Sequence, residues 1–349
     1  GMPAGAVSVT DGADLYARIK AGMEDASLSE LVFCLQNGVD YYLNEEGAAD
    51  GKTGTIVLTK SIALLAEPGE HPTLYVREGG FQVGTDPHID YFTVENVDVE
   101  ENVPDNSRGS KTYLFGVGKR SAGNDCTIDR FELVNSAVML PTGVIMMNEA
   151  NDGVTTINHI RIDNCRVTGI NDTKLVTKQF GFIHAPKKGG NVWNDVRVTN
   201  STFYEFYISP GVFGSLTADA TVTEGGNVSI SNCTFYNWAT KKTSYTAVGD
   251  FSELSVPLNL SVSGCLFGYS AGKILDAGVC NTTVRNNYCT TDFEQLSSPG
   301  LTLVSLDTTD EALFLDAAAG DFTLIDGSSV VYQQEYGDPR WIPVDADVK

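Results

Sequence analysis

Seven polar residues lie at or just beyond the ends of three short apolar runs, residues 113–117, 143–147 and 180–184. They are Lys119, Arg120, Asn148, Glu149, His184, Lys187 and Lys188. If the three runs are stacked parallel strands, these side chains share one rim and lie within roughly 10 Å of one another. A base and a cation at that distance suit β-elimination of a uronic acid. In that reaction His184 or a lysine removes the carbon-bound proton, and Arg120 or Lys187 holds the carboxylate.

On this hypothesis the catalytic candidates are His184, Lys187, Arg120 and Glu149, and the substrate-binding candidates are Lys119, Asn148 and Lys188. The alternative is structural. Lys187 and Lys188 are then solvated loop charges, and His184 is a hydrogen-bonded residue at a strand edge. A glycoside hydrolase needs two carboxyl groups that converge on one bond, and the sequence shows no motif for such a pair.

Aromatic residues suggest a second kind of contact with a sugar. Trp193, Tyr207 and Trp238 fall close to expected strand ends and loops. Flat rings that face a groove can stack on sugar faces, so these three residues are further substrate-binding candidates. Packing inside the fold is the alternative for each of them.

A repeated phrase defines the elements that must position these residues. The pattern apolar-x-apolar-x-Asn-x-x-apolar recurs, with substitutions, between residues 92 and 289. The second apolar residues of its copies are Val94, Ile128, Ile162, Val198, Ile230, Val262 and Val284. Recurrence of a phrase at similar steps indicates a repeat architecture, and alternation on both sides of the Asn favours two short strands.

The Asn of the phrase predicts a sharp corner between the two strands. Asn tolerates the left-handed backbone conformation better than other residues that carry a side chain. Gly264, which meets the same demand, replaces it in the sixth copy. Arg130 replaces it in the second copy, which we interpret as a coil with a different corner. Stacked copies predict a column of Asn amides that hydrogen-bond between coils.

A third apolar run after each phrase predicts three parallel strands in every coil, with the coils added one upon another. We expect an N-terminal cap over residues 1–54, coils over 55–300, and a C-terminal cap and tail over 301–349. The first cap contains the first strands and an amphipathic helix with Leu15, Ile19, Met23 and Leu28 on one face. Such a helix covers the exposed sheet edges at the end of the stack.

The phrase, the capped start and the three-strand coil resemble the right-handed parallel β-helix of the pectate-lyase-like superfamily. The closing residues 321–323 (Asp-Phe-Thr) and 337–341 (Gly-Asp-Pro-Arg-Trp) resemble lyase-like β-helix proteins of unknown function from polysaccharide-utilisation loci of gut bacteria. The resemblance implies an all-β, right-handed parallel β-helix and an exported protein, whether secreted, periplasmic or at the cell surface. The sequence motifs of pectinase-type hydrolases and pectate lyases are not present.

The formal net charge of −22 at pH 7 disfavours nucleic acid and anionic membranes as partners. An acidic glycan could still bind through a bridging divalent cation, and the only cofactor we consider is Ca²⁺. Two acidic groups are its candidate ligands: Asp86, His88 and Asp90, and Asp98, Glu100 and Glu101. Solvated surface loops are the alternative for both groups.

Seven cysteines leave two alternatives open. Cys165, Cys233 and Cys265 directly follow the corner residue, where a small buried thiol fits. Stacked coils would also bring Cys233 and Cys265 close enough for a disulfide.

No run of 18 apolar residues is present, so we expect no membrane-spanning helix. We also expect a monomer.

Two functions from different classes follow. The first is an exported polysaccharide-binding protein that captures a glycan in a groove without an acid–base pair. The second is a polysaccharide lyase or a glycoside hydrolase with a non-standard site near His184. An adhesin is a weaker third option.

Overall fold

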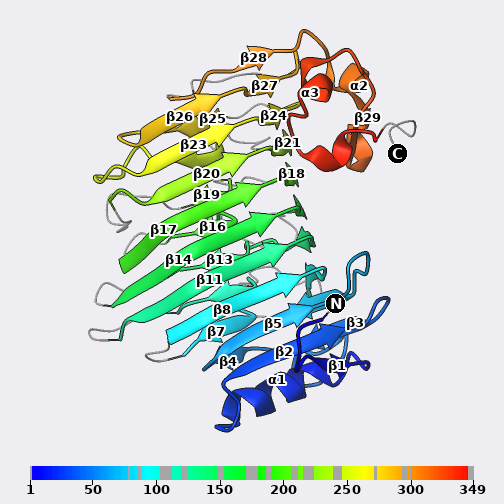
Figure 1. The fold of residues 1–349 in the computed structure, drawn as a ribbon, viewed down its shortest axis with the longest axis vertical. Coiled ribbons are helices and arrows are strands. Elements are labelled where there is room, and N and C mark those ends of the chain that lie inside the picture. The colour runs from blue at the N-terminus through cyan, green and yellow to red at the C-terminus, as the bar shows by residue number, and fades with distance from the viewer. Residues whose placement is uncertain are drawn as a thin grey trace.

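The chain winds into a right-handed parallel β-helix with three strands in each coil (Figure 1). The computed structural model describes residues 2–77, 79–84, 88–102, 112–118, 124–147, 153–169, 180–185, 190–205, 211–214, 224–238, 246–270, 273–292, 298 and 300–344. Front strands run from left to right in Figure 1 while the coils rise from bottom to top, which defines the right-handed winding. The expected fold class is confirmed.

Three long parallel sheets form the sides of the helix, and we call them sheets A, B and C. Sheet A contains β1 (Val7–Val9), β2 (Glu30–Leu35), β5 (Ser61–Leu65), β8 (His88–Glu95), β11 (Cys126–Val134), β14 (Val154–Asp163), β17 (Gly190–Thr199), β20 (Asn227–Ser231), β23 (Asn259–Ser263) and β26 (Asn281–Arg285). Sheet B contains β3 (Asp40–Leu43), β6 (Thr73–Val76), β9 (Asp98–Glu101), β12 (Ala137–Met139), β15 (Arg166–Thr168), β18 (Thr202–Tyr204), β21 (Thr234–Tyr236), β24 (Leu266–Phe267), β27 (Tyr288–Cys289) and β28 (Val304–Ser305). Sheet C contains β4 (Ile56–Leu58), β7 (Phe81–Val83), β10 (Phe115–Gly116), β13 (Ile145–Met146), β16 (Ile183–His184), β19 (Phe213–Gly214), β22 (Thr246–Asp250) and β25 (Lys273–Asp276).

The corner between sheets A and B is where the sequence pattern predicts it. Positive φ angles of 51° to 64° occur at Asn96, Asn135, Asn164, Asn200, Asn232, Gly264 and Asn286. The backbone N–H groups of the corner residues from Asn96 to Gly264 each donate a hydrogen bond to a carbonyl of the next coil. The Asn164 N–H, for example, donates to Thr199 O at 3.2 Å. The chain can therefore turn sharply and stay hydrogen-bonded, because Asn and Gly accept the left-handed conformation.

The expected amide column is only partly present. Asn135 Nδ2 donates to Asn96 Oδ1 at 2.6 Å, and Asn164 Nδ2 donates to Asn135 Oδ1 at 3.1 Å. Asn200 instead donates to Asp163 Oδ1 at 3.0 Å, and Asn232 donates to Glu335 O at 3.2 Å. Neighbouring carboxylate and carbonyl oxygens therefore replace the amide partner in the later coils.

The interpretation of Arg130 as a corner residue is wrong. In the register of β11 with β8 and β14, Leu133 pairs with Val94 and Ile162, so Asn135 is the corner residue of this coil. Arg130 lies inside β11 with an exposed side chain. Residues 131–138 match the phrase without any substitution, and the expected register was displaced by five residues (133 − 128).

The interior is filled by inward-facing apolar side chains that stack between coils. Phe203, Phe235 and Phe267 form one column, with ring centroids 5.4 and 5.0 Å apart and nearly parallel planes. Complete burial of such a side chain contributes about 1.5–3 kcal/mol, so each added coil extends a stabilising core. The outward-facing positions between these residues are then free to carry other chemistry.

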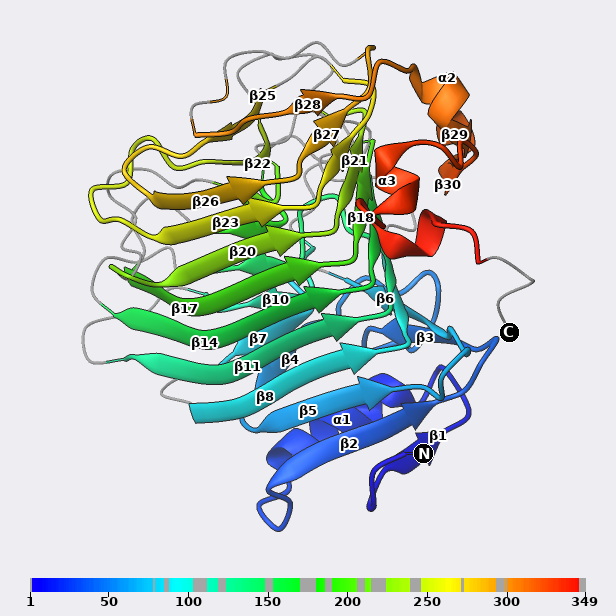
Figure 2. The same ribbon diagram turned by 45° about the horizontal axis from the view of Figure 1, so that its top comes forward.

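The N-terminal end is capped by α1 (Leu15–Glu24), which lies across the first coil in Figure 1 and Figure 2. Leu15, Ile19 and Met23 are buried as expected, whereas Leu28 lies beyond the helix and is 43% exposed. Sheet A already begins at β1 and sheet B at β3, so strands of the stacked sheets lie before residue 55, and β28 extends sheet B past residue 300.

The C-terminal residues form a unit that covers the outer face of sheet B. We call this unit, residues 306–342, the cover. It contains α2 (Asp310–Leu313), β29 (Phe314–Asp316), η1 (Ala317–Ala319), β30 (Asp321–Leu324), α3 (Val330–Gln333) and η2 (Pro339–Trp341). Phe322 is fully buried against Tyr204 and Tyr236 of sheet B, with centroids 5.6 and 5.3 Å away. The cover is thus packed through aromatic contacts.

The closing Gly-Asp-Pro-Arg-Trp motif attaches the end of the cover to the coils. The buried Asp338 carboxylate accepts a hydrogen bond from Thr202 Oγ1 at 2.7 Å, and the backbone N–H of Asp338 donates to Thr234 Oγ1 at 2.9 Å. Arg340 donates to Asp338 at 2.9 Å and to Asn164 Oδ1 at 2.8 Å. The motif therefore has a structural role, because its residues hydrogen-bond the end of the cover to the coils.

All seven cysteines are free thiols, so the alternative of a disulfide between Cys233 and Cys265 is wrong. Cys165, Cys233 and Cys265 are fully buried.

Within the described residues, no helix combines the length and the hydropathy that crossing a bilayer requires.

Candidate functional site

Most residues of the expected catalytic rim lie outside the described residues. These are Lys119, Arg120, Asn148, Glu149, Lys187 and Lys188, together with the aromatic candidate Tyr207. Their roles stay predictions. His184, Trp193 and Trp238 are described.

His184, the last residue of β16, is enclosed by residues that precede this strand. Its side chain is buried, and the Gly181 N–H donates to Nδ1 at 3.1 Å. The Phe180 ring packs edge-on against the imidazole, with centroids 5.1 Å apart. Burial lowers the pKa of His184 to about 4, so the imidazole is neutral at pH 7 and weakly basic. Its Nδ1 lone pair is already engaged, which agrees with the structural alternative for this residue.

The expectation that Trp193 and Trp238 face a groove is wrong. Both side chains have 0% exposure. Trp193 occupies an inward position of β17, and its indole N–H donates to Met147 Sδ. The indole N–H of Trp238 donates to Lys273 O at 2.9 Å. Both rings fill the interior, so neither has a face for a sugar.

The outer face of sheet A is the best-defined polar surface. Adjacent strands pair in strict parallel register, so outward-facing residues line up in rows that cross the coils. One row consists of Asp195, Asn227, Asn259 and Asn281, and the next consists of Arg197, Ser229, Ser261 and Thr283. Neighbours in a row are separated by roughly 4.8 Å, the spacing of hydrogen-bonded strands.

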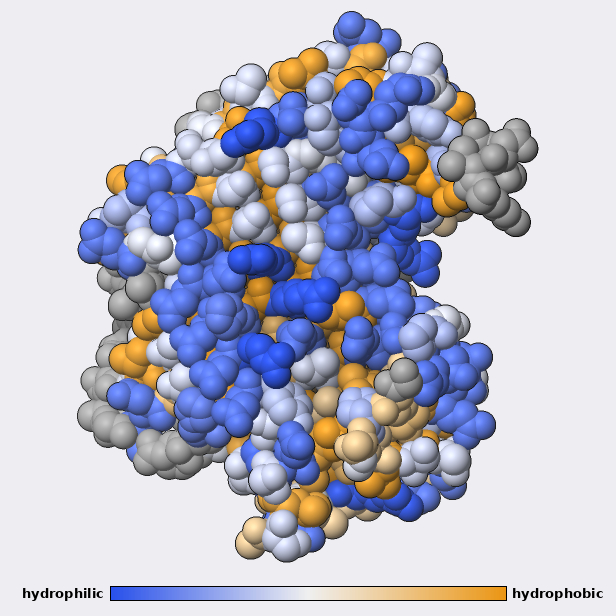
Figure 3. Space-filling view, in the orientation of Figure 1, coloured by the Kyte–Doolittle hydropathy of each residue, from blue (hydrophilic) through white to orange (hydrophobic). Residues whose placement is uncertain are grey.

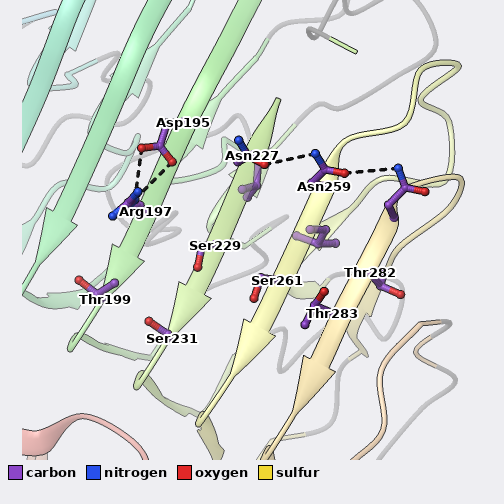
Figure 4. Close-up of a pocket in the computed structure, with 13 residues that line it drawn as sticks. Asp195, Arg197, Thr199, Asn227, Ser229, Ser231, Asn259, Ser261, Thr282 and Thr283 are labelled. Atoms are coloured by element: carbon purple, nitrogen blue, oxygen red, sulfur yellow. Dashed lines mark hydrogen bonds and ion pairs between the residues drawn. The ribbon is translucent and has the colours of Figure 1, made fainter. Parts of the chain in front are cut away.

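A groove of about 570 Å³ lies over β17, β20, β23 and β26 (Figure 4). Asn259 Nδ2 donates to Asn227 Oδ1 at 3.2 Å, and Asn281 Nδ2 donates to Asn259 Oδ1 at 3.3 Å. The hydroxyl groups of Ser229, Ser261 and Thr283 stand beside this amide row. We call this surface the polar groove. It presents many neutral hydrogen-bond donors and acceptors on rigid strands.

Charged groups enter the polar groove at one end. Arg197 Nε lies 3.2 Å from Asp195 Oδ2, and both side chains line the groove on β17. In Figure 4 Asp195 stands at the β17 end of the amide row, and Arg197 stands at the same end of the hydroxyl row. A charged pair there can orient a polar ligand through stronger hydrogen bonds than neutral groups form.

The same face is strongly charged over β11 and β14. Arg161 Nη1 lies 3.5 Å from Glu132 Oε2, and its Nη2 lies 3.2 Å from Asp163 Oδ2. Arg130 Nη1 lies 3.2 Å from Glu132 Oε1. Figure 3 shows strongly hydrophilic residues over the middle of sheet A and less hydrophilic ones over β20 and β23. The two halves of one sheet face therefore differ in charge.

A second hollow of about 440 Å³ lies between sheet B and the end of the cover. His71, Asp98, Arg166, Arg340 and Trp341 line it, and His71 Nδ1 is 3.0 Å from Asp98 Oδ1. Arg340 is occupied by Asp338 and Asn164. Arg340 in this hollow therefore also serves to attach the cover to the coils.

Sequence reasoning missed the polar groove although its signal is visible. Residues 227–231 and 259–263 read Asn-Val-Ser-Ile-Ser and Asn-Leu-Ser-Val-Ser, and residues 281–285 read Asn-Thr-Thr-Val-Arg. The alternating polar positions of the phrase form the outward rows. Attention to the apolar positions alone identified the core and overlooked the surface.

One family model, described as a domain of unknown function (DUF5123), matches residues 228–341. The matched part runs from β20 to η2 and so contains three of the four strands under the polar groove together with the cover. No curated protein and no solved structure matches the chain.

Proposed function

We propose that the protein is a polysaccharide-binding β-helix protein that captures a glycan in the polar groove. The observation that carries the proposal is the row of amides beside a row of hydroxyls on β20, β23 and β26. Sugars present hydroxyl groups that both donate and accept hydrogen bonds, as amide and hydroxyl side chains do. The repeat of the rows, roughly 4.8 Å, is close to the length of one pyranose unit.

The charge of the surroundings supports a neutral glycan. Most groove residues are uncharged, and Asp195 and Arg197 compensate each other. The chain carries a net charge of −22, which repels a polyanion at long range. The resemblance to β-helix proteins of polysaccharide-utilisation loci supports an exported protein, either at the cell surface or in the periplasm.

Binding is tested by calorimetry against a panel of neutral and uronic-acid polysaccharides, with and without Ca²⁺. We expect binding to a neutral member that does not require Ca²⁺. Ser261→Tyr places a large ring in the middle of the groove and is expected to weaken binding at least tenfold. Ser8→Tyr is the matched control, because Ser8 is an exposed residue on β1 at the other end of the same sheet.

Asn259→Ala removes the central amide of the row and tests the hydrogen bonds rather than the shape. We expect about a tenfold loss of affinity, the equivalent of about 1.4 kcal/mol. Equal binding by the native protein, Ser261→Tyr and Asn259→Ala would place the glycan elsewhere. Formation of ultraviolet-absorbing unsaturated ends from uronate polymers would instead support the lyase.

A further inference from the structure

Three potential metal ligands converge on sheet A where β8 and β11 run side by side. His88 Nε2 lies 3.2 Å from Asp90 Oδ1 and 3.1 Å from Asp129 Oδ2. The three donor atoms lie within 4.8 Å of one another. Ile89 pairs with Ile128 in the register, so Asp90 and Asp129 occupy adjacent positions on neighbouring strands.

Hydrogen bonding alone does not account for this arrangement well. Nε2 of an imidazole carries at most one hydrogen, yet it faces two carboxylate oxygens at nearly equal distances. Like charges directly across two strands destabilise a sheet. Among the described residues, no Lys or Arg forms an ion pair with Asp90 or Asp129. A positive charge at the centre of the three groups would remove the conflict.

The two distances from His88 Nε2 to the carboxylate oxygens fit a small divalent ion. Zn²⁺ binds imidazole nitrogen and carboxylate oxygen at about 2.0–2.1 Å. Ligand atoms at those lengths are about 3.3 Å apart in a tetrahedron and about 2.9 Å apart in an octahedron. The observed separations of 3.1 and 3.2 Å fall between these values.

An amide relay outside the cluster orients Asp129. Asn158 Nδ2 donates to Asp129 Oδ1 at 2.9 Å, and Asn194 Nδ2 donates to Asn158 Oδ1 at 2.7 Å. This relay occupies Oδ1 and leaves Oδ2 directed at His88. Hydrogen bonds of this kind fix carboxylate ligands in metal sites. Asn158 and Asn194 continue the row of Asp90 and Asp129 on β14 and β17, so among these four strands only β8 and β11 carry a carboxylate in this row.

We propose that His88, Asp90 and Asp129 bind a first-row divalent transition ion of the Zn²⁺ class. Three protein ligands leave at least one coordination position for water or for an oxygen of a bound ligand. The side chains of His88 and Asp90 are 61% and 73% exposed, so the ion can exchange with solvent. The proposal is independent of the polar groove, which lies on later coils.

The proposal revises the expected calcium ligands. Ca²⁺ prefers six to eight oxygen ligands at 2.3–2.6 Å, whereas this cluster supplies a nitrogen and short separations. Asp86 lies outside the described residues, and Asp129 of the next coil completes the set. Within the described part of the chain, Asp98, Glu100 and Glu101 do not form a comparable group of converging donors.

The test is titration of the chelator-treated, tag-free protein with Co²⁺, followed by its visible absorption, and then displacement by Zn²⁺. We expect one Co²⁺ per chain with a nitrogen–oxygen ligand spectrum. Zn²⁺ should displace it, and a large excess of Ca²⁺ should not. His88→Gln and Asp129→Asn are each expected to weaken binding at least tenfold, with the folded state checked by circular dichroism.

The matched control is His159→Gln. His159 lies on the outer face of the same sheet, is similarly exposed at 59%, and contacts a single carboxylate, Asp195, at 3.3 Å. We expect it to leave Co²⁺ binding unchanged. The proposal is overturned if the native protein binds no Co²⁺, if Ca²⁺ displaces it as readily as Zn²⁺ does, or if His88→Gln and His159→Gln behave alike.

Discussion

The outer faces of sheets A and B differ although the same coils build both. Over β20, β23 and β26, sheet A presents rows of Asn, Ser and Thr that stay open as the polar groove. Over β18, β21 and β24, sheet B presents Thr202, Tyr204 and Tyr236, which the cover buries or partly buries. A β-helix offers equivalent outward positions on both sheets, and the side chains there decide whether a face binds a ligand or another part of the chain.

The difference corrects a simple reading of aromatic residues. Tyr204 and Tyr236 point outward from sheet B, and outward-facing rings are expected to be platforms for sugars. Phe322 of the cover occupies that place. The uncovered face is the polar one, because a flat row of amides and hydroxyls gains little from burial by the chain's own apolar side chains.

Removal of the Asp338 carboxylate is expected to have the largest effect on the difference between sheets A and B, because it weakens the attachment of the cover to sheet B. Asp338→Ala leaves Arg340 and the Thr202 hydroxyl without their common partner, and we expect a loss of about 3 kcal/mol in unfolding free energy. The hydrogen bond from the residue 338 N–H to Thr234 does not depend on the side chain. Urea unfolding gives the value, and limited proteolysis should show the cover released first. Glu311→Ala, an exposed site in the same unit, is the control. Unchanged stability of Asp338→Ala would contradict a structural role for the closing motif.

Substitution of Asn200 tests the corner that turns sheet A into sheet B. Asn200→Ala places an ordinary residue at φ 51° and removes the hydrogen bond to Asp163, which together cost about 2 kcal/mol. Asn200→Gly removes the hydrogen bond but accepts the conformation, so about 1 kcal/mol is expected. Thermal unfolding of the two variants measures the contrast. If Gly is as destabilising as Ala, the left-handed conformation does not explain the Asn.

Asp310 makes the attachment of the cover depend on pH. Its carboxylate accepts hydrogen bonds from the Tyr269 N–H and from Thr290 at the ends of β24 and β27. Burial, together with the neighbouring Asp292, raises the pKa of Asp310 to about 7. A raised folded-state pKa gives stability that is complete below about pH 4 and is lost as the pH rises through 7.

We therefore expect the unfolding free energy to fall by on the order of 1 kcal/mol between pH 4 and pH 8, allowing for solvent screening. Asp310→Asn imitates the protonated carboxyl group and should flatten this dependence. Denaturant unfolding at several pH values measures both proteins. Parallel pH curves for the two would show that Asp310 does not titrate in this range. Burial raises the pKa of Asp292, but its hydrogen bonds with Thr290 and Asp310 outweigh that effect and lower the pKa, so its contribution changes only in more acidic solution.

The repeated phrase made much of the fold predictable. Alternating apolar residues specify inward positions, and Asn or Gly at the break specifies the corner, because both effects depend only on neighbours in the sequence. The second copy shows the limit of this reasoning. Ile128 and Leu133 are both inward residues of the long strand β11, and only pairing with β8 and β14 selects the register.

The candidate site was less predictable because it depends on rows that cross coils. The polar groove joins Asn227, Asn259 and Asn281, which are far apart in the chain and align only after the coils stack. The metal cluster likewise needs Asp129 from the coil after His88. Trp193 and Trp238 near expected loops gave no signal that their rings turn inward, since that choice is made by packing.

The sequence by itself determined the repeat, the three-strand coil, the helical cap and the corner conformation, because local periodicity and backbone sterics are sufficient for each. Tertiary structure decided the register of the Arg130 coil, the burial of the tryptophans and which sheet face stays open. Those features depend on contacts between residues that are remote in the chain, where packing and hydrogen-bond partners select among arrangements that the local sequence allows equally.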